Sequence, residues 1–132
     1  MTQNELLYYI NDKFNLSVES TDADQFCCHD ANNIKYVVEL KCRTAHYDDQ
    51  FIEKNKCERN HEERDFLYIV STPRGVYGWD ITKLVNEGYD FQWETRSLPA
   101  TTTFSNRQFI DKEVGYLHID NAHWRGNYDF ID

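Results

Sequence analysis

One stretch decides the expected fold, residues 34–42, which read Ile34-Lys35-Tyr36-Val37-Val38-Glu39-Leu40-Lys41-Cys42. Side chains at every second position would share one face, and this alternation is typical of a β-strand. One face is then mainly apolar, while Glu39 and Lys41 project side by side from the other. A carboxylate and an ammonium on a covered strand face are costly unless they pair or bind something. This pair is therefore the first candidate for a functional site.

The flanking sequence predicts helices and further strands around this stretch. Thr2-Gln3-Asn4-Glu5 fits a capping box, and apolar residues at helical spacing extend a helix over 3–14. Residues 30–33 have turn chemistry, and Asp48 or Asp49 can cap a second helix that runs to about Asn60. The remaining expected elements are weak strands at 16–19 and 25–29, a hairpin of 66–70 with 76–79, a short helix over 82–87 closed by Gly88, and strands at 91–96 and 114–119.

Composition limits the architecture and the compartment. A length of 132 residues with 40% apolar residues predicts one domain over 1–132. No apolar run is long enough to span a bilayer, and the first residues lack the features of a secretory signal, so we expect a cytoplasmic protein without membrane contact. Cys27, Cys28, Cys42 and Cys57 form no CxxC pair and are expected to be reduced thiols. The net charge of -9 opposes loose binding to a polyanion.

The order of these elements, with Glu39-Leu40-Lys41 on the last strand of the first group, resembles the core of the PD-(D/E)xK nuclease superfamily. Asp24-Gln25-Phe26-Cys27-Cys28 supplies the acidic residue that precedes an apolar strand in that superfamily, and Ala23 stands where its proline would be. Residues 36–43 and 75–80 also look like small uncharacterised phage-encoded members. The resemblance implies an α/β fold with a restriction-endonuclease-like core, in which helices flank a mixed central β-sheet.

That resemblance implies a divalent-metal-dependent endonuclease or phosphodiesterase that hydrolyses DNA. Two carboxylates would hold Mg²⁺ or Mn²⁺, which polarises the phosphate and lowers the pKa of a bound water. Asp24 and Glu39 are the expected metal ligands, with the Leu40 carbonyl as a further oxygen. Lys41 would assist the attacking water. On the expected helix after the motif strand, Gln50 and Lys54 match positions that often carry auxiliary polar residues.

Several assignments stay open. Asp22 and Asp30 are rivals of Asp24 for the first carboxylate, although Asp30 fits a role in the turn better. Glu5 matches an acidic metal-facing position on the first helix, but the capping box already explains it. Gln50 and Lys54 are equally well explained as a solvated helix face. The histidines have no regular metal-ligand spacing and are expected to be structural or surface residues.

Two other functions compete with the nuclease. The nuclease fold could persist without hydrolysis, as a module that binds nucleic acid or a protein partner, such as a phage-encoded inhibitor; the acidic composition favours this alternative. A plain structural α/β protein would instead carry Glu39 and Lys41 on a wet face, with both side chains fully exposed. By analogy with nucleases that address two strands, we also expect a homodimer.

Overall fold

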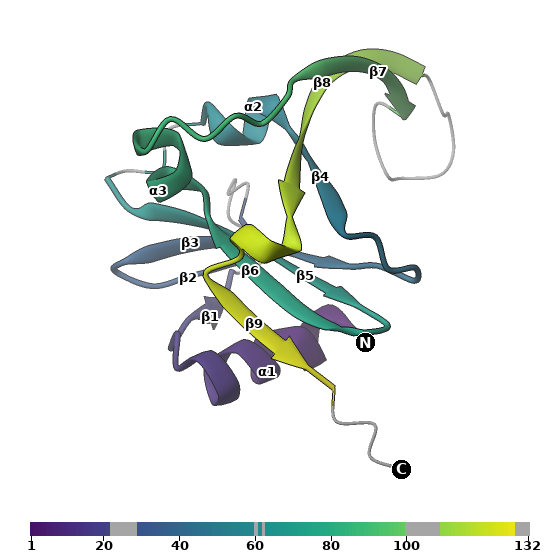
Figure 1. Cartoon of the computed structure of the whole chain (residues 1–132). Coiled ribbons are helices and arrows are strands. Elements are labelled where there is room, and N and C mark those ends of the chain that lie inside the picture. Colours follow the sequence, from purple (N-terminus) through teal and green to yellow (C-terminus); the bar gives the residue numbers. More distant parts are fainter. Residues whose placement is uncertain (22–28, 60, 62, 100–108, 129–132) are drawn as a thin grey trace.

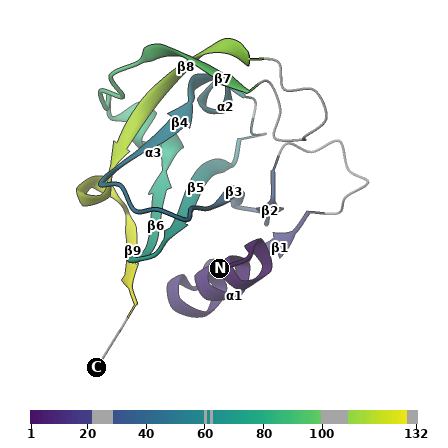
Figure 2. The ribbon, with the colours of Figure 1, turned by 90° about the vertical axis from the view of Figure 1, so that its right-hand side faces the viewer.

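The computed structural model describes residues 1–21, 29–59, 61, 63–99 and 109–128. Among these residues it contains a six-stranded sheet and a three-stranded sheet, which lie on opposite sides of a shared core (Figures 1 and 2). The helices are α1 (Gln3–Phe14), α2 (Lys54–Cys57) and α3 (Ile81–Asn86), with a 3₁₀ turn η1 (Ile119–Asn121). The strands are β1 (Glu19–Ser20), β2 (Ala31–Asn32), β3 (Tyr36–Cys42), β4 (Asp49–Glu53), β5 (Asp65–Thr72), β6 (Gly75–Asp80), β7 (Glu94–Pro99), β8 (Phe109–His118) and β9 (Trp124–Asn127).

Helix α1 forms where the capping box predicts it. The Thr2 hydroxyl accepts from the Glu5 amide at 3.1 Å, and the Glu5 carboxylate accepts from the Thr2 amide at 2.9 Å. Two of the amides that a helix start leaves without partners are thereby satisfied. The helix ends at Asn15, whose φ of 57° is left-handed. Leu6 and Ile10 are fully buried against the larger sheet.

The larger sheet has the order β1-β2-β3-β5-β6-β9. Strands β3 and β5 are parallel, and every other neighbouring pair is antiparallel. The prediction of a mixed central sheet is therefore confirmed. The register sets Glu39 of β3 beside Tyr68 of β5, and Lys41 beside Val70.

The alternation of β3 separates two cores. Val38 and Leu40 face α1, whereas Val37 faces the core between the two sheets. This second core contains Tyr68 and Trp79 of the larger sheet and Ile52 and Leu117 of the smaller one. The expectation that helices flank the sheet is correct for one face of the larger sheet, which α1 covers. The other face is covered by the smaller sheet together with α3 (Figure 2).

The predicted helix over 48–60 is wrong. Residues Asp49–Glu53 form β4, which pairs antiparallel with β8 in the order β4-β8-β7, and only Lys54–Cys57 are helical. Gln50 and Ile52 are buried while Asp49 is exposed, so the segment alternates with a period of two. Pairing with a strand far along the chain outweighs its helical spacing.

The other elements agree more closely with the sequence. The hairpin is formed by β5 and β6, and α3 begins one residue before its predicted start and is followed by Gly88 at a φ of +76°. Strand β7 lies three residues later than expected, and β8 begins at Phe109 rather than Val114. The predicted strand at 25–29, together with Asp22, Asp24, Cys27 and Cys28, lies mostly or wholly outside the described residues.

Candidate functional site

Glu39 is a buried carboxylate on the face of β3 that points toward the second core. Only 5% of the residue is exposed, and Val37 and Tyr68 beside it are apolar core residues. A carboxylate at such a position loses most of its hydration, which is unfavourable without compensation. The wet-face hypothesis, which predicted full exposure of this side chain, is therefore wrong for Glu39.

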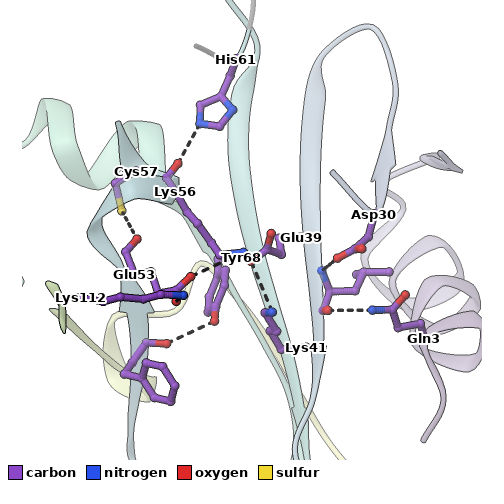
Figure 3. Close-up of polar contacts among 12 residues, drawn as sticks. Gln3, Asp30, Glu39, Lys41, Glu53, Lys56, Cys57, His61, Tyr68 and Lys112 are labelled. Carbon is purple, nitrogen blue, oxygen red and sulfur yellow. Dashed lines mark hydrogen bonds and ion pairs between the residues drawn. The ribbon is translucent and has the colours of Figure 1, made fainter. Parts of the chain in front are cut away.

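Two ammonium groups face the same oxygen of Glu39. Lys41 Nζ lies 3.7 Å from Oε2, and Lys56 Nζ, from α2, lies 2.7 Å from it (Figure 3). The shorter distance defines a close ion pair, but Oε2 has no partner that meets hydrogen-bond geometry among the described residues. The contact between Lys56 and Glu39 is therefore an ion pair whose angles do not meet hydrogen-bond geometry. Oε2 thus has its charge compensated while its hydrogen-bonding capacity is unused.

The ion pairs continue from Lys56 into the smaller sheet. Lys56 Nζ is also 3.9 Å from Glu53 Oε2, and Lys112 Nζ of β8 donates to Glu53 Oε1 at 2.7 Å. Burial opposes ionisation of Glu53, yet its pKa lies below the ordinary value because of the Lys112 hydrogen bond and the nearby lysine charges. Amines and carboxylates therefore alternate from Lys41 through Glu39, Lys56 and Glu53 to Lys112, and we call this series the ion-pair chain.

Asp30 lies just before β2, at the edge of β3. Its Oδ2 accepts the Leu40 amide at 2.7 Å, and the Gln3 side-chain amide donates to the Leu40 carbonyl at 3.3 Å. Figure 3 shows Asp30 and Gln3 on one side of β3, and Lys56 and Glu53 on the other. Burial raises the pKa of Asp30 and the Glu39 charge adds to this, while the Leu40 hydrogen bond, Lys41 and Lys56 oppose it. The two carboxylates are therefore close enough to influence each other electrostatically.

The turn role expected for Asp30 belongs to Asn33. Asn33 Oδ1 accepts the amides of Lys35 and Tyr36 at 2.8 and 2.6 Å, which is the local bonding that shapes such turns. The Asp30 carboxylate instead accepts the Leu40 amide of β3, in the place that a backbone carbonyl of a neighbouring strand would take. Its side chain is therefore tied to the motif strand rather than to the reversal of the chain.

Three of the predicted site residues do not join Glu39. Glu5 is exposed and serves the capping box, and the hydrogen bonds from Thr2 lower its pKa. Gln50 lies on β4, where it is buried and donates to the Tyr47 carbonyl at 2.7 Å. Lys54 pairs with Glu113 at 3.4 Å and with Glu58 at 3.9 Å, neither of which belongs to the ion-pair chain.

Lys56 and Glu53 are the residues that sequence reasoning missed. A helix beginning at Asp48 or Asp49 would place Gln50 and Lys54 on one face. Because α2 begins only at Lys54, its single turn directs Lys56 to Glu39 instead. The sequence carries no clear signal for this, because polar Asp49 and Gln50 are followed by apolar Phe51 and Ile52; the period of two appears only in the burial of the folded strand.

Neighbouring groups give the site further polar character. His61 Nε2 lies 3.2 Å from the Lys56 carbonyl, which can only accept, so Nε2 bears the proton. Burial lowers the pKa of both His61 and His29, whose rings lie 5.6 Å apart. Cys57 is a thiol whose pKa burial raises to about 12, and both Cys42 and Cys57 are free.

No protein-family model, curated protein or solved structure matches this chain. Across the described ranges, no three His, Cys, Asp or Glu side chains gather into a metal-binding group. The helices in that part of the chain are all too short or too polar to cross a bilayer. Function must therefore be inferred from the side chains around Glu39 themselves.

Proposed function

We propose that this protein is a divalent-metal-dependent nuclease that hydrolyses phosphodiester bonds in DNA. The main support is Glu39, a buried carboxylate whose Oε2 forms ion pairs with Lys41 and Lys56 but meets hydrogen-bond geometry with no group among the described residues. Buried polar atoms whose hydrogen-bonding capacity is unused are rare, and they require either a structural or a functional explanation. A divalent cation bound in place of the Lys56 ammonium would coordinate this oxygen.

The arrangement of elements supports the same proposal. Helix α1 is followed by the antiparallel series β1, β2 and β3, and the chain then crosses through β4 and α2 to the parallel strand β5. This is the order that the resemblance to PD-(D/E)xK nucleases implies for a restriction-endonuclease-like core. Glu39 and Lys41 occupy the strand on which that core holds its signature.

The oxygen donors near Glu39 have the chemistry that Mg²⁺ or Mn²⁺ prefers. Glu39 would hold the ion together with the Leu40 carbonyl and a second carboxylate, for which Asp30 is the candidate among the described residues. Asp24, outside those residues, remains the alternative. When bound, the metal polarises the phosphate and generates a nucleophilic water. Lys41, with an ammonium 3.7 Å from Glu39, would orient that water or stabilise charge on the phosphate.

The local charge favours a nucleic-acid substrate despite the net charge of -9. The ion-pair chain contains more amines than carboxylates, and Arg43 reaches the Tyr68 hydroxyl at 3.5 Å on the same side of the sheet. A few such cations near the reacting phosphate can position a substrate even when the remaining surface is acidic. The auxiliary role expected for Gln50 or Lys54 passes to Lys56 in this proposal.

A catalytically silent nuclease-fold module is the second candidate. The specific observation in its favour is the 2.7 Å contact between Lys56 and Glu39, in which the protein supplies its own counterion. Such a module would bind nucleic acid or a protein partner, for instance as a phage-encoded inhibitor acting in the host cytoplasm. No saturable binding of Mg²⁺ or Mn²⁺ by calorimetry, together with a stable complex with a partner, would favour this candidate over the enzyme.

A cleavage assay tests the enzyme directly. Purified protein is incubated with linear, circular, nicked and branched DNA in Mg²⁺ or Mn²⁺, beside Glu39→Gln, Lys41→Met, Asp30→Asn and Asp24→Asn. We expect cleavage by the wild type and a loss of about 100-fold or more in Glu39→Gln and Lys41→Met. Loss in Asp30→Asn or in Asp24→Asn identifies the second carboxylate. Full activity of Lys41→Met, or no cleavage of any substrate by the wild type, would refute the proposal.

Size-exclusion chromatography with light scattering tests the homodimer expected by analogy.

A further inference from the structure

Lys56 has two carboxylate partners at unequal distances, and this inequality is the basis of a further inference. Its Nζ lies 2.7 Å from Glu39 Oε2 and 3.9 Å from Glu53 Oε2, so the ammonium sits between the two and closer to Glu39. Its side chain is only 15% exposed. An ammonium removed from water in this way has few alternatives to these carboxylates.

The backbone of Lys56 is held in place, and a second carboxylate oxygen lies near the end of its side chain. The Lys56 carbonyl accepts from His61, and α2 places the residue between β3 and β4 (Figure 3). A lysine side chain has a flexible stem with a compact charge at its end, so a displacement of an ångström or so is inexpensive. Glu53 already has Lys112 at 2.7 Å on its other oxygen, which leaves Oε2 available for Lys56.

We propose that Lys56 is an internal counterion that holds Glu39 Oε2 in the metal-free protein and transfers to Glu53 when a divalent cation binds Glu39. This inference rests on the proposed function and adds a regulatory device to it. The ammonium and the metal compete for one oxygen, so they cannot both be bound at full strength. Metal affinity is therefore set partly by how strongly Lys56 prefers Glu39 to Glu53.

The proposal makes predictions of opposite sign for neighbouring residues. Lys56→Met removes the competitor and should tighten Mn²⁺ binding by about tenfold or more. Glu53→Gln removes the receiving carboxylate, so Lys56 stays on Glu39 and Mn²⁺ binding weakens. Lys54→Met is the matched control, because it removes the same charge from the same helix, where Lys54 pairs with Glu113 and Glu58 instead. The affinity of Lys54→Met for Mn²⁺ should stay within about twofold of that of the wild type.

Isothermal titration calorimetry at constant ionic strength measures these affinities without any need for catalysis. Lys56→Gln repeats the test with a polar side chain in case Lys56→Met folds poorly, and thermal unfolding identifies any variant that has lost its structure. A second readout follows the lysine itself in protein labelled with ¹³C at lysine Cε. The Lys56 signal, identified by its absence in Lys56→Met, should shift on Mg²⁺ addition, while the Lys54 signal should not.

The outcomes separate this inference from the proposed function. Tighter binding by Lys56→Met and Lys56→Gln, with no change in Lys54→Met and a shifted Lys56 signal, supports the transfer. If the wild type binds Mn²⁺ and the Lys56 variants bind it no better than Lys54→Met, the transfer is overturned and the nuclease proposal stands. If neither the wild type nor the Lys56 variants bind Mn²⁺ or Mg²⁺, both are overturned.

Discussion

Asp80 offers a stability test whose size follows from the structure. Its residue is only 7% exposed, its Oδ1 accepts the Lys83 amide at 3.0 Å as the N-cap of α3, and its carboxyl shares a hydrogen bond with Asp65. Burial, and then the neighbouring Asp65 carboxyl, raise the pKa of Asp80 from 3.8 to about 6. Both effects favour the protonated carboxyl of Asp80 over its ionised form in the native state.

The sign of the pH dependence follows from this raised pKa. Between about pH 4 and pH 6 the native state retains a proton that the unfolded chain has released, so the free energy of unfolding falls as the pH rises. Above pH 6 the native state bears the full cost of ionising Asp80. With 1.36 kcal/mol for each pKa unit, this cost is at most about 3 kcal/mol. Below pH 4 it vanishes, because Asp80 is protonated in both states.

Asp80→Asn should remove that cost. An asparagine amide can donate to Asp65 as the protonated carboxyl does, while its oxygen still accepts from Lys83, and asparagine is a good N-cap. We expect the variant to be more stable than the wild type by up to about 3 kcal/mol at pH 7 to 8, and by little at pH 4. Urea unfolding at several pH values measures the difference, and Asp90→Asn, at an exposed site, controls for the lost charge. Equal or lower stability of Asp80→Asn at pH 8, or a difference that does not shrink toward pH 4, would refute the reasoning.

Three further predictions concern other parts of the fold. Because burial raises the pKa of Cys57 to about 12 while Cys42 is exposed, N-ethylmaleimide at pH 8 should modify Cys42 of the native protein far faster than Cys57, as peptide mass spectrometry would show; comparable rates would contradict this. Gly115→Ala should destabilise the protein by about 1 to 3 kcal/mol in urea unfolding, because a Cβ there would lie 2.7 Å from the Phe91 Cβ and from two ring carbons of Trp93; a neutral effect would contradict this expectation. Thr2→Ala should lower the free energy of unfolding by about 1 kcal/mol, because the helix cap is lost. Glu5→Gln should leave DNA cleavage unchanged, and a large loss of cleavage in this variant would return Glu5 to the metal site.

The sequence predicts best where local signals are strong. Helix α1 follows from its capping box and apolar spacing, and both of its ends match the prediction. The alternation of β3 correctly separates Val38 and Leu40 from Glu39 and Lys41, because a period of two leaves few alternatives when both faces are covered.

Elements that depend on distant partners are harder to predict. Strand β4 is short, and its polar residues also fit a helix, so its pairing with β8 decides its conformation. This error carried over to the site, because a helix starting at Asp48 or Asp49 points Lys54 toward the motif strand, whereas a turn starting at Lys54 points Lys56 there. The role of Asp30 likewise depends on the Leu40 amide, which only the folded sheet brings within 2.7 Å.

The central claim is that Glu39 binds a divalent cation, and crystals grown with Mn²⁺ test it most directly. Diffraction data collected near the manganese absorption edge would locate the ion by its anomalous signal. We predict a peak at bonding distance from a Glu39 carboxylate oxygen, with Lys56 moved toward Glu53. Well-ordered crystals in excess Mn²⁺ with no anomalous peak at Glu39, and with Lys56 still paired to its Oε2, would contradict the account.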